Sequence, residues 1–235
     1  MRTPEETSPT PSQPAQLAAD LLATLRTARP GGRLLLGLVG PPGAGKSVLA
    51  RYLVGEVERA EGPGSAAYVP MDGFHLSNAQ LDRLGLRDRK GAPASFDAFG
   101  YAALLARLAA DRFHDIYVPD FDRDLDEPVA ARHLVGPNAR LVVTEGNYLA
   151  ADAPGWSQAR ELLRELWYLE VDDAVRDARL LRRHRGHGRT PEAARAWIDS
   201  NDQPNGAYVE LSRSRCTRVL RVAELPLPAV GSSVP

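Results

Sequence analysis

The chain has little cysteine or lysine and no long run of apolar residues. Cys216 is the only cysteine among 235 residues, so no intrachain disulfide can form, which fits a reducing cytoplasm. No apolar stretch approaches the roughly 18 residues needed to cross a bilayer. Residues 1–15 are rich in Pro, Thr and Ser and lack the apolar segment of a signal peptide. We therefore expect a cytoplasmic protein without membrane association.

The charges of the chain are nearly balanced. A formal net charge of −1 argues against nucleic-acid binding through bulk positive charge. With 43% hydrophobic residues, the chain can bury one sizeable core. We expect a single domain over residues 16–230, between a disordered tail at 1–15 and a short tail at 231–235. The composition is compatible with a homodimer and leaves the oligomeric state open.

The most informative segment is residues 40–47. Its sequence, Gly-Pro-Pro-Gly-Ala-Gly-Lys-Ser, matches the phosphate-binding loop G-x-x-x-x-G-K-S, whose backbone N–H groups cradle phosphates. In this pattern Lys46 reaches the outer phosphates and the Ser47 hydroxyl can bind Mg²⁺. The alternative is a Gly-rich turn that binds nothing. The predicted nucleotide-binding residues of the loop are Gly40, Pro41, Pro42, Gly43, Ala44, Gly45, Lys46, Ser47 and Val48.

The residues around the loop support the nucleotide-binding interpretation. An apolar run at 33–39 predicts a buried strand before it. Apolar residues at helical spacing after it predict a helix, whose N-terminus would direct partial positive charge at the phosphates. Strand, loop and helix are the context that the motif requires, and we therefore expect the protein to bind a nucleotide.

Lysine scarcity marks a second candidate residue. The 29 Lys and Arg residues include only two lysines, Lys46 and Lys90. Where Arg is used so much more often than Lys, we expect the few lysines to lie mainly at positions where Arg cannot replace them, because the two side chains are not interchangeable at a phosphate. Lys90 is therefore a candidate functional residue, although a chance surface lysine remains the alternative.

The remaining pattern predicts an α/β fold. Apolar runs predict strands at 33–39, 66–71, 140–144, 166–171 and 218–222. Helical patterns occupy 16–28 and 176–185, and another helix begins after Asp97. Residues 73–95 are expected to be mostly loop with one short helix. Strands alternating with helices imply a mostly parallel five-stranded sheet with helices on both faces, and ligands bind beyond the carboxyl ends of such strands.

The phosphate loop, Asp72 and Glu145 would then line one cleft at the edge of the sheet and could support phosphoryl transfer. Asp72, after the second predicted strand, could accept a proton from a hydroxyl or hold Mg²⁺ through water; its alternative role is to cap the turn at Gly73. Glu145 ends the central predicted strand and could face the metal, or could cap a helix. Arg176, Arg179 and Arg183 share one helical face. With the following glycines they could form a lid over the nucleotide, at about 176–206, or a solvated surface.

Five ordered motifs give the chain a family resemblance. They are residues 40–47, 71–75 (Met-Asp-Gly-Phe-His), 90–97, 145–149 (Glu-Gly-Asn-Tyr-Leu) and the Arg-rich segment. Over roughly residues 31–222 the chain resembles the phosphoribulokinase/uridine kinase/bacterial pantothenate kinase superfamily of P-loop kinases. It looks closest to the nucleoside/nucleotide kinase-like branch, which includes fructose-transport-type sugar kinases.

The resemblance implies a P-loop kinase fold with an Arg-rich lid, and roles for particular residues. The implied catalytic residues are Asp72, Lys46 and Arg183. The implied nucleotide-binding residues of the lid are Arg179, Arg183 and Arg189. The implied Mg²⁺-site residues are Ser47, Glu145 and Asp72. The implied substrate-binding residues are Asp72, His75, Lys90, Phe121, Asp122, Arg123, Glu145 and Tyr148.

One motif departs from the uridine kinase pattern. Residues 121–123 (Phe-Asp-Arg) stand where uridine kinases carry a Tyr-Asp acceptor motif. Uridine kinases follow it with a His and an Arg that bind the nucleoside, whereas this chain has Asp-Leu-Asp-Glu-Pro at 124–128. The departure argues against a nucleoside acceptor.

The sequence therefore predicts an ATP- and Mg²⁺-dependent kinase acting on a hydroxyl of a small polar metabolite. A sugar or polyol is the first choice of acceptor. The alternatives within enzymes are a uridine/cytidine-type nucleoside kinase and a pantothenate kinase. The alternative from another class is a nucleotide-switched regulatory NTPase, against which the chain lacks an N-K-x-D guanine-reading motif.

Overall fold

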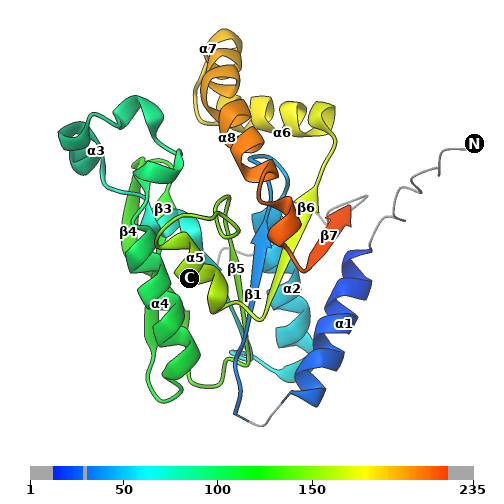
Figure 1. Cartoon of the computed structure of the whole chain (residues 1–235). Coiled ribbons are helices and arrows are strands. Elements are labelled where there is room, and N and C mark those ends of the chain that lie inside the picture. Colours follow the sequence, from blue (N-terminus) through cyan, green and yellow to red (C-terminus); the bar gives the residue numbers. More distant parts are fainter. Residues whose placement is uncertain (1–12, 29–30, 222–235) are drawn as a thin grey trace, which may run out of the picture.

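A five-stranded sheet forms the centre of the molecule (Figure 1). The computed structural model describes residues 13–28 and 31–221. The strand order is β2-β5-β1-β6-β7, and every neighbouring pair is parallel. The strands are β1 (Leu34–Val39), β2 (Ala66–Pro70), β5 (Leu141–Glu145), β6 (Glu165–Glu170) and β7 (Arg218–Arg221). The five predicted strands and their parallel arrangement are confirmed; the predicted end of the last one, Val222, lies outside the described residues.

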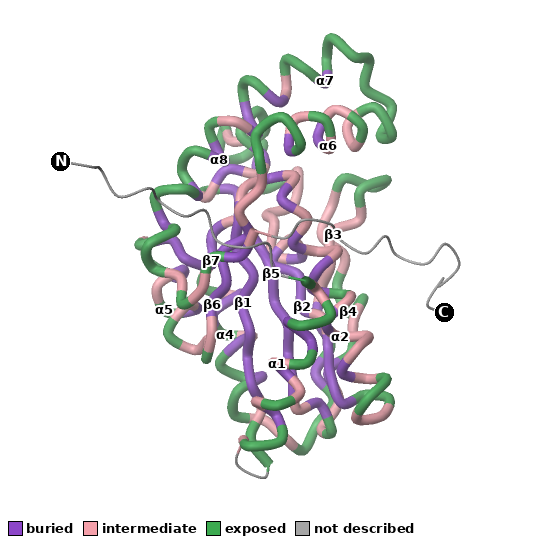
Figure 2. The backbone as a smooth tube through the Cα atoms, turned by 90° about the vertical axis from the view of Figure 1, so that its right-hand side faces the viewer, coloured by how far each residue is buried: buried purple, intermediate pink, exposed green. Residues whose placement is uncertain are grey.

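Both faces of the sheet are covered, as the continuous apolar character of its strands requires. All six residues of β1 are buried. On one face lie α1 (Pro14–Thr27) and α2 (Lys46–Glu61), through leucines such as Leu17, Leu21 and Leu49. On the other lie α4 (Ala98–Ala110) and α5 (Trp156–Glu161). Figure 2 shows the buried strands enclosed by helices with exposed outer sides.

The starts of two helices can be compared with the expectations from the sequence. The predicted N-cap Asp97 is confirmed, because its Oδ1 accepts a hydrogen bond of 2.8 Å from the Gly100 amide at the start of α4. The predicted N-terminal helix begins at Pro14, two residues before its expected start at Gln16. Most of the two expected tails falls on residues 1–12 and 222–235, which lie outside the described part of the chain.

The sequence did not predict a two-stranded antiparallel sheet outside the main one. β3 (Ile116–Asp122) and β4 (Glu127–Val135) form this hairpin. Two prolines, Pro119 and Pro128, lie within its strands, and proline normally argues against a strand because it cannot donate to the ladder. The segment at 73–95 is close to expectation: α3 (Asn78–Leu84) is its only α-helix, with 3₁₀ turns at Arg87–Arg89 and Pro93–Ser95.

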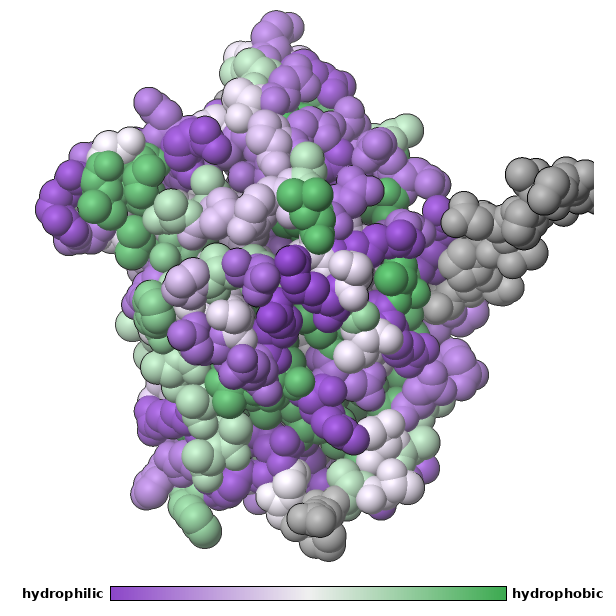
Figure 3. Space-filling view, viewed as in Figure 1, coloured by the Kyte–Doolittle hydropathy of each residue, from purple (hydrophilic) through white to green (hydrophobic). Residues whose placement is uncertain are grey.

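The Arg-rich segment forms a helical layer above the carboxyl ends of the strands (Figure 1). It consists of α6 (Asp173–Gly186), α7 (Pro191–Trp197), a π-helical turn (Ile198–Asp202) and α8 (Gln203–Glu210). Figure 3 shows that this upper part of the molecule is mostly hydrophilic on the face in view. Across residues 13–28 and 31–221, no helix has the length and apolar character needed to cross a membrane.

The central strand should carry much of the stability. Leu36 is fully buried in β1, and Leu36→Ala should lower the free energy of unfolding by about 2–5 kcal/mol, because the methyl groups lose their contacts and leave a cavity. Denaturant unfolding followed by circular dichroism measures this change. The matched control is Leu134→Ala, at a leucine 51% exposed on β4, which should change stability by no more than about 0.5 kcal/mol. Equal losses in both variants would contradict this account of the core.

Candidate active site

The phosphate loop joins β1 to α2 at the carboxyl edge of the sheet. Gly45 is the N-cap of α2 and has a left-handed backbone, with φ of 95°, a conformation that glycine adopts without strain. The first turn of α2 therefore directs its free N–H groups into the loop. The strand–loop–helix arrangement expected around residues 40–48 is present.

Lys46 is buried at the centre of this loop, with 7% of its surface exposed. Its Nζ donates to Gly40 O at 2.8 Å, Pro41 O at 3.1 Å and Asn147 Oδ1 at 2.8 Å. Burial lowers the pKa of Lys46 to about 8, although the negative charges of Glu145 and Asp72 act in the opposite direction. The ammonium group is thus held among neutral acceptors at the point where phosphates would supply negative charge.

Glu145 ends β5 beside the loop and has two hydroxyl partners. Ser47 Oγ donates to Glu145 Oε1 at 2.9 Å, and Tyr68 OH donates to the same oxygen at 2.8 Å. Burial, followed by the charge of Asp72, raises the pKa of the Glu145 carboxyl. Ser47 and Glu145 present adjacent oxygen atoms, the ligand type that Mg²⁺ takes, so these residues fit the predicted metal site.

Asp72 lies in a 3₁₀ turn, Met71–Phe74, directly after β2. Its Oδ2 is 3.2 Å from Arg123 Nη2 on the hairpin side of the site. A side chain at Gly73 would collide with the backbone of Pro119, so glycine allows β3 to pass directly against the turn. The structure therefore brings Asp72 and Arg123, predicted from separate motifs, into contact.

His75 follows the same turn and is packed between two aromatic rings. Its Nδ1 donates to the carbonyl oxygen of Asp72 at 2.8 Å. The centroid of its ring lies 4.0 Å from that of Phe96 and 4.6 Å from that of Phe121. Burial lowers the pKa of His75, which favours the neutral ring. His75 thus fixes the turn that carries Asp72.

Two predicted acceptor residues are engaged with neighbouring protein groups. Lys90 Nζ forms an ion pair of 2.9 Å with Asp126 Oδ2 and donates to Asn78 Oδ1 at 2.6 Å. The Asp122 carboxylate accepts from the Asp124 and Leu125 amides at 3.0 Å each. Both side chains therefore hold the turn between β3 and β4, residues 123–126.

Tyr148, another predicted substrate-binding residue, donates its OH to Gly91 O and so holds the backbone next to Lys90.

The lid arginines occupy three different positions. Arg179 Nη1 lies over the phosphate loop, 3.4 Å from Gly43 O and 3.3 Å from Ala44 O. Arg183 Nη2 is 3.6 Å from Asp202 Oδ1, and its charge acts on Lys46. Arg189 instead stacks on the Trp197 ring, with its guanidinium carbon 4.2 Å from the centroid. Arg179 therefore contacts the loop, Arg183 pairs with Asp202 and acts on Lys46 through its charge, and Arg189 packs against Trp197 in the helical layer.

Arg176 lies at the base of the lid beside a cavity of about 200 Å³. It forms an ion pair of 3.1 Å with Asp173 and a hydrogen bond to Gln203. Its Nε and Nη1 are buried with no partner among the described residues. Pro41 of the phosphate loop lines the same cavity, so Arg176 and the loop border one space.

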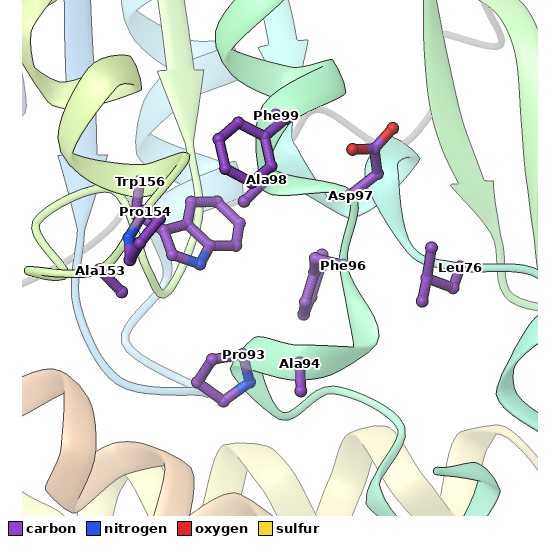
Figure 4. Close-up of a pocket in the computed structure, with 10 residues that line it drawn as sticks. All are labelled: Leu76, Pro93, Ala94, Phe96, Asp97, Ala98, Phe99, Ala153, Pro154 and Trp156. Carbon is purple, nitrogen blue, oxygen red and sulfur yellow. The ribbon is translucent and has the colours of Figure 1, made fainter. Parts of the chain in front are cut away.

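A second pocket of about 400 Å³ lies at the N-terminus of α4. Figure 4 shows Trp156 and Pro154 along one side, with Pro93, Ala94 and Phe96 across from them. Its lining is mostly apolar, and no residue of the phosphate loop belongs to it. Phe96 connects it to the site, because the same ring stacks on His75.

Sequence reasoning missed two partners of the central charges. Tyr68 holds Glu145, and Asn147 accepts from Lys46. The signal for Asn147 was its place inside the Glu-Gly-Asn-Tyr-Leu motif at 145–149. Tyr68 could have been noticed as the one polar-tipped residue in the second apolar strand, two residues before its end.

Comparisons with known proteins agree with this geometry. Over 207 residues, covering 86% of this chain and 87% of the relative, the chain is 35% identical to a Schizosaccharomyces pombe protein named "Putative uridine kinase C227.14". It is 31% identical to the Escherichia coli protein YggC over 205 residues, 87% of this chain and 84% of the relative. No family profile matches the chain.

A solved structure is similar over nearly its whole length. It is described as a "putative fructose transport system kinase" from Silicibacter sp. TM1040, with a TM-score of 0.80 and 38% identity, covering 88% of this chain and 98% of that one. The chain belongs to the uridine kinase-like family of P-loop kinases. The resemblance inferred from the five motifs of this P-loop kinase is confirmed.

The buried Lys46 should make nucleotide binding depend on pH. In the free protein its pKa is about 8, and bound phosphates favour the charged form, so this P-loop kinase should take up protons when ADP binds above that pH. Affinity should fall as the pH rises through the pKa, because the neutral amine must first be protonated. Calorimetric titration with ADP and Mg²⁺ in two buffers of different ionisation enthalpy measures the uptake, which should increase from about pH 7.5 to about pH 8.5.

Lys46→Arg is the matched control, since the guanidinium stays charged over this range and its proton uptake should not increase. Wild-type protein with equal uptake at both pH values would show that Lys46 is already charged before nucleotide binds.

Proposed function

We propose that the protein transfers the γ-phosphoryl group of ATP, with Mg²⁺, to a hydroxyl of a small polar metabolite. The observation that carries this proposal is the electrostatic grouping of three residues at one edge of the sheet. Lys46 follows β1, Asp72 follows β2 and Glu145 ends β5, where it accepts a hydrogen bond from Ser47 beside Lys46. A phosphate-binding cation, an oxygen ligand for Mg²⁺ and a carboxylate that can accept the hydroxyl proton are the parts that phosphoryl transfer requires.

In the proposed reaction the acceptor hydroxyl lies against Asp72. The hydroxyl oxygen forms a bond to the γ-phosphorus, its proton passes to the Asp72 carboxylate, and the bond from the γ-phosphorus to the β–γ bridging oxygen breaks to leave ADP. Lys46 and the loop amides hold the phosphates, and Arg179 and Arg183 offset the negative charge that develops. Ser47 and Glu145 would hold Mg²⁺, which neutralises phosphate charge when bound.

The acceptor that we favour is a sugar or polyol. The exposed Arg123 guanidinium beside Asp72 can bind hydroxyl oxygens, and the similar Silicibacter protein is described as a fructose transport system kinase. Against a nucleoside, residues 124–128 form the β3–β4 turn and the start of β4 and lack the His and Arg of uridine kinases. A nucleoside acceptor stays the alternative because of the name of the S. pombe relative, and a nucleotide-switched NTPase is the alternative from another class.

Removing the proposed base should separate catalysis from binding. Asp72→Asn keeps the shape of the side chain but loses its basicity, so kcat should fall by about 10²–10⁴ with nearly unchanged nucleotide affinity. Steady-state kinetics and calorimetry measure the two effects. Asp82→Asn, an exposed carboxylate on α3, is the control. If ATP binding collapsed while the rate at saturation survived, Asp72 would be a metal ligand rather than the base.

ADP release tests the reaction class and the acceptor together. Mg·ATP is incubated with the protein alone and with sugars, glycerate, pantothenate or pyrimidine nucleosides. Release should increase with a sugar or polyol and disappear in Lys46→Ala, because the phosphates lose their buried cation. Fast release that is equal in every mixture would contradict a kinase and favour an NTPase.

A further inference from the structure

The helical layer formed by α6 to α8, the proposed lid, contacts the segment 87–96 at the peptide carbonyls of Lys90 and Gly91. Asn201 Nδ2 donates to Lys90 O at 2.9 Å, and Asn205 Nδ2 donates to Gly91 O at 3.3 Å. Asn205 also donates to Asn201 Oδ1 at 3.1 Å. Both asparagines are buried, with 6% and 5% of their surfaces exposed. The contact is specific, because Asn201 Nδ2 would lose its bond to Lys90 O if residues 90–91 moved away, while Asn205 would keep its bond to Asn201 Oδ1 and Gly91 O its bond from the Tyr148 OH.

The same turn of the lid also contacts Arg183, whose charge acts on Lys46. Asn201 and Asp202 lie in the π-helical turn Ile198–Asp202, a rare form that is frequent at functional sites. Asp202 Oδ2 lies 2.7 Å from His184 Nε2, and its Oδ1 lies 3.6 Å from Arg183 Nη2. One turn therefore contacts both Arg183, on the nucleotide side, and Lys90, on the acceptor side.

From Lys90 a chain of side-chain contacts continues to Asp72. The Lys90 ammonium pairs with Asp126 and lies 4.9 Å from the centroid of the Phe121 ring. Phe121 in turn stacks on His75, which bonds to the Asp72 carbonyl. A shift of the backbone at Lys90 would thus reach the group that we propose as the base.

We propose that Asn201 and Asn205 form a latch that couples nucleotide binding to the order of the acceptor segment, residues 87–96. This inference rests on the proposed function, since it requires a nucleotide on the phosphate loop. Phosphates that bind Arg179 and Arg183 hold the lid down, and the latch then holds the Lys90–Gly91 backbone in place. By linkage, an acceptor that orders this segment strengthens nucleotide binding by the same factor. Asn201 and Asn205 are positioning residues.

Hydrogen–deuterium exchange tests the latch without knowledge of the acceptor. The probe is the non-hydrolysable ATP analogue AMP-PNP with Mg²⁺. In the wild-type protein it should slow exchange in residues 40–49 directly and in residues 87–96 by about tenfold. In the double variant Asn201→Ala, Asn205→Ala the slowing at 87–96 should fall below about twofold, while the protection of 40–49 stays. Ser200→Ala, an exposed position in the same turn, is the matched control and should respond as the wild type does.

The outcomes separate the latch from the proposed function. Wild-type protein without protection at 40–49 would contradict nucleotide binding itself. Protection at 40–49 without a response at 87–96, or a full response in the double variant, would overturn the latch alone. Exchange in α1 and α2 without nucleotide reports whether the variant is folded. Should the double variant be unfolded, Asn201→Asp keeps the volume and removes the donor to Lys90 O; it should lose the response at 87–96, and a retained response would equally overturn the latch.

Discussion

The buried ammonium of Lys46 is the constraint on which the rest of the site depends. A charge removed from water is costly unless it is paired and hydrogen-bonded. Three neutral oxygens and two nearby carboxylates, Glu145 and Asp72, offset this cost in part. Burial still lowers the pKa of Lys46 to about 8. An additional negative charge beside Lys46, at the place where the loop amides also converge, would therefore stabilise the ammonium group.

The parallel sheet explains why these groups meet. β5 lies between β1 and β2 and pairs with both in parallel, and the carboxyl ends of parallel strands share one edge. Lys46 follows β1, Asp72 follows β2 and Glu145 ends β5. The helical layer of α6 to α8 lies above that edge (Figure 1), so Arg179 contacts the loop from that side, and the charge of Arg183 acts on Lys46. The fold thus places cations above and below the space expected for the phosphates.

Sequence reasoning succeeded where structure is local or strongly periodic. The phosphate loop, the five strands and the Asp97 cap depend on short patterns with one physical solution. It failed for the β3–β4 hairpin, because the prolines of both strands argue against a strand, whereas the two segments pair along their length and β3 passes directly against the turn at Gly73. The assignment of Lys90 to substrate binding stays a prediction, and in the structure its ammonium group pairs with Asp126.

By itself the sequence determined the phosphate-binding loop, the class of fold and the identity of the charged residues at the strand ends. Those features follow from adjacent residues and from a periodicity that local backbone geometry imposes. Only the tertiary structure decided that Tyr68 holds Glu145 and that Asn201 meets the carbonyl of Lys90, 111 residues away. Such contacts form when separate elements pack together. The spacing of residues along the chain does not predict which polar side chains will be buried against each other.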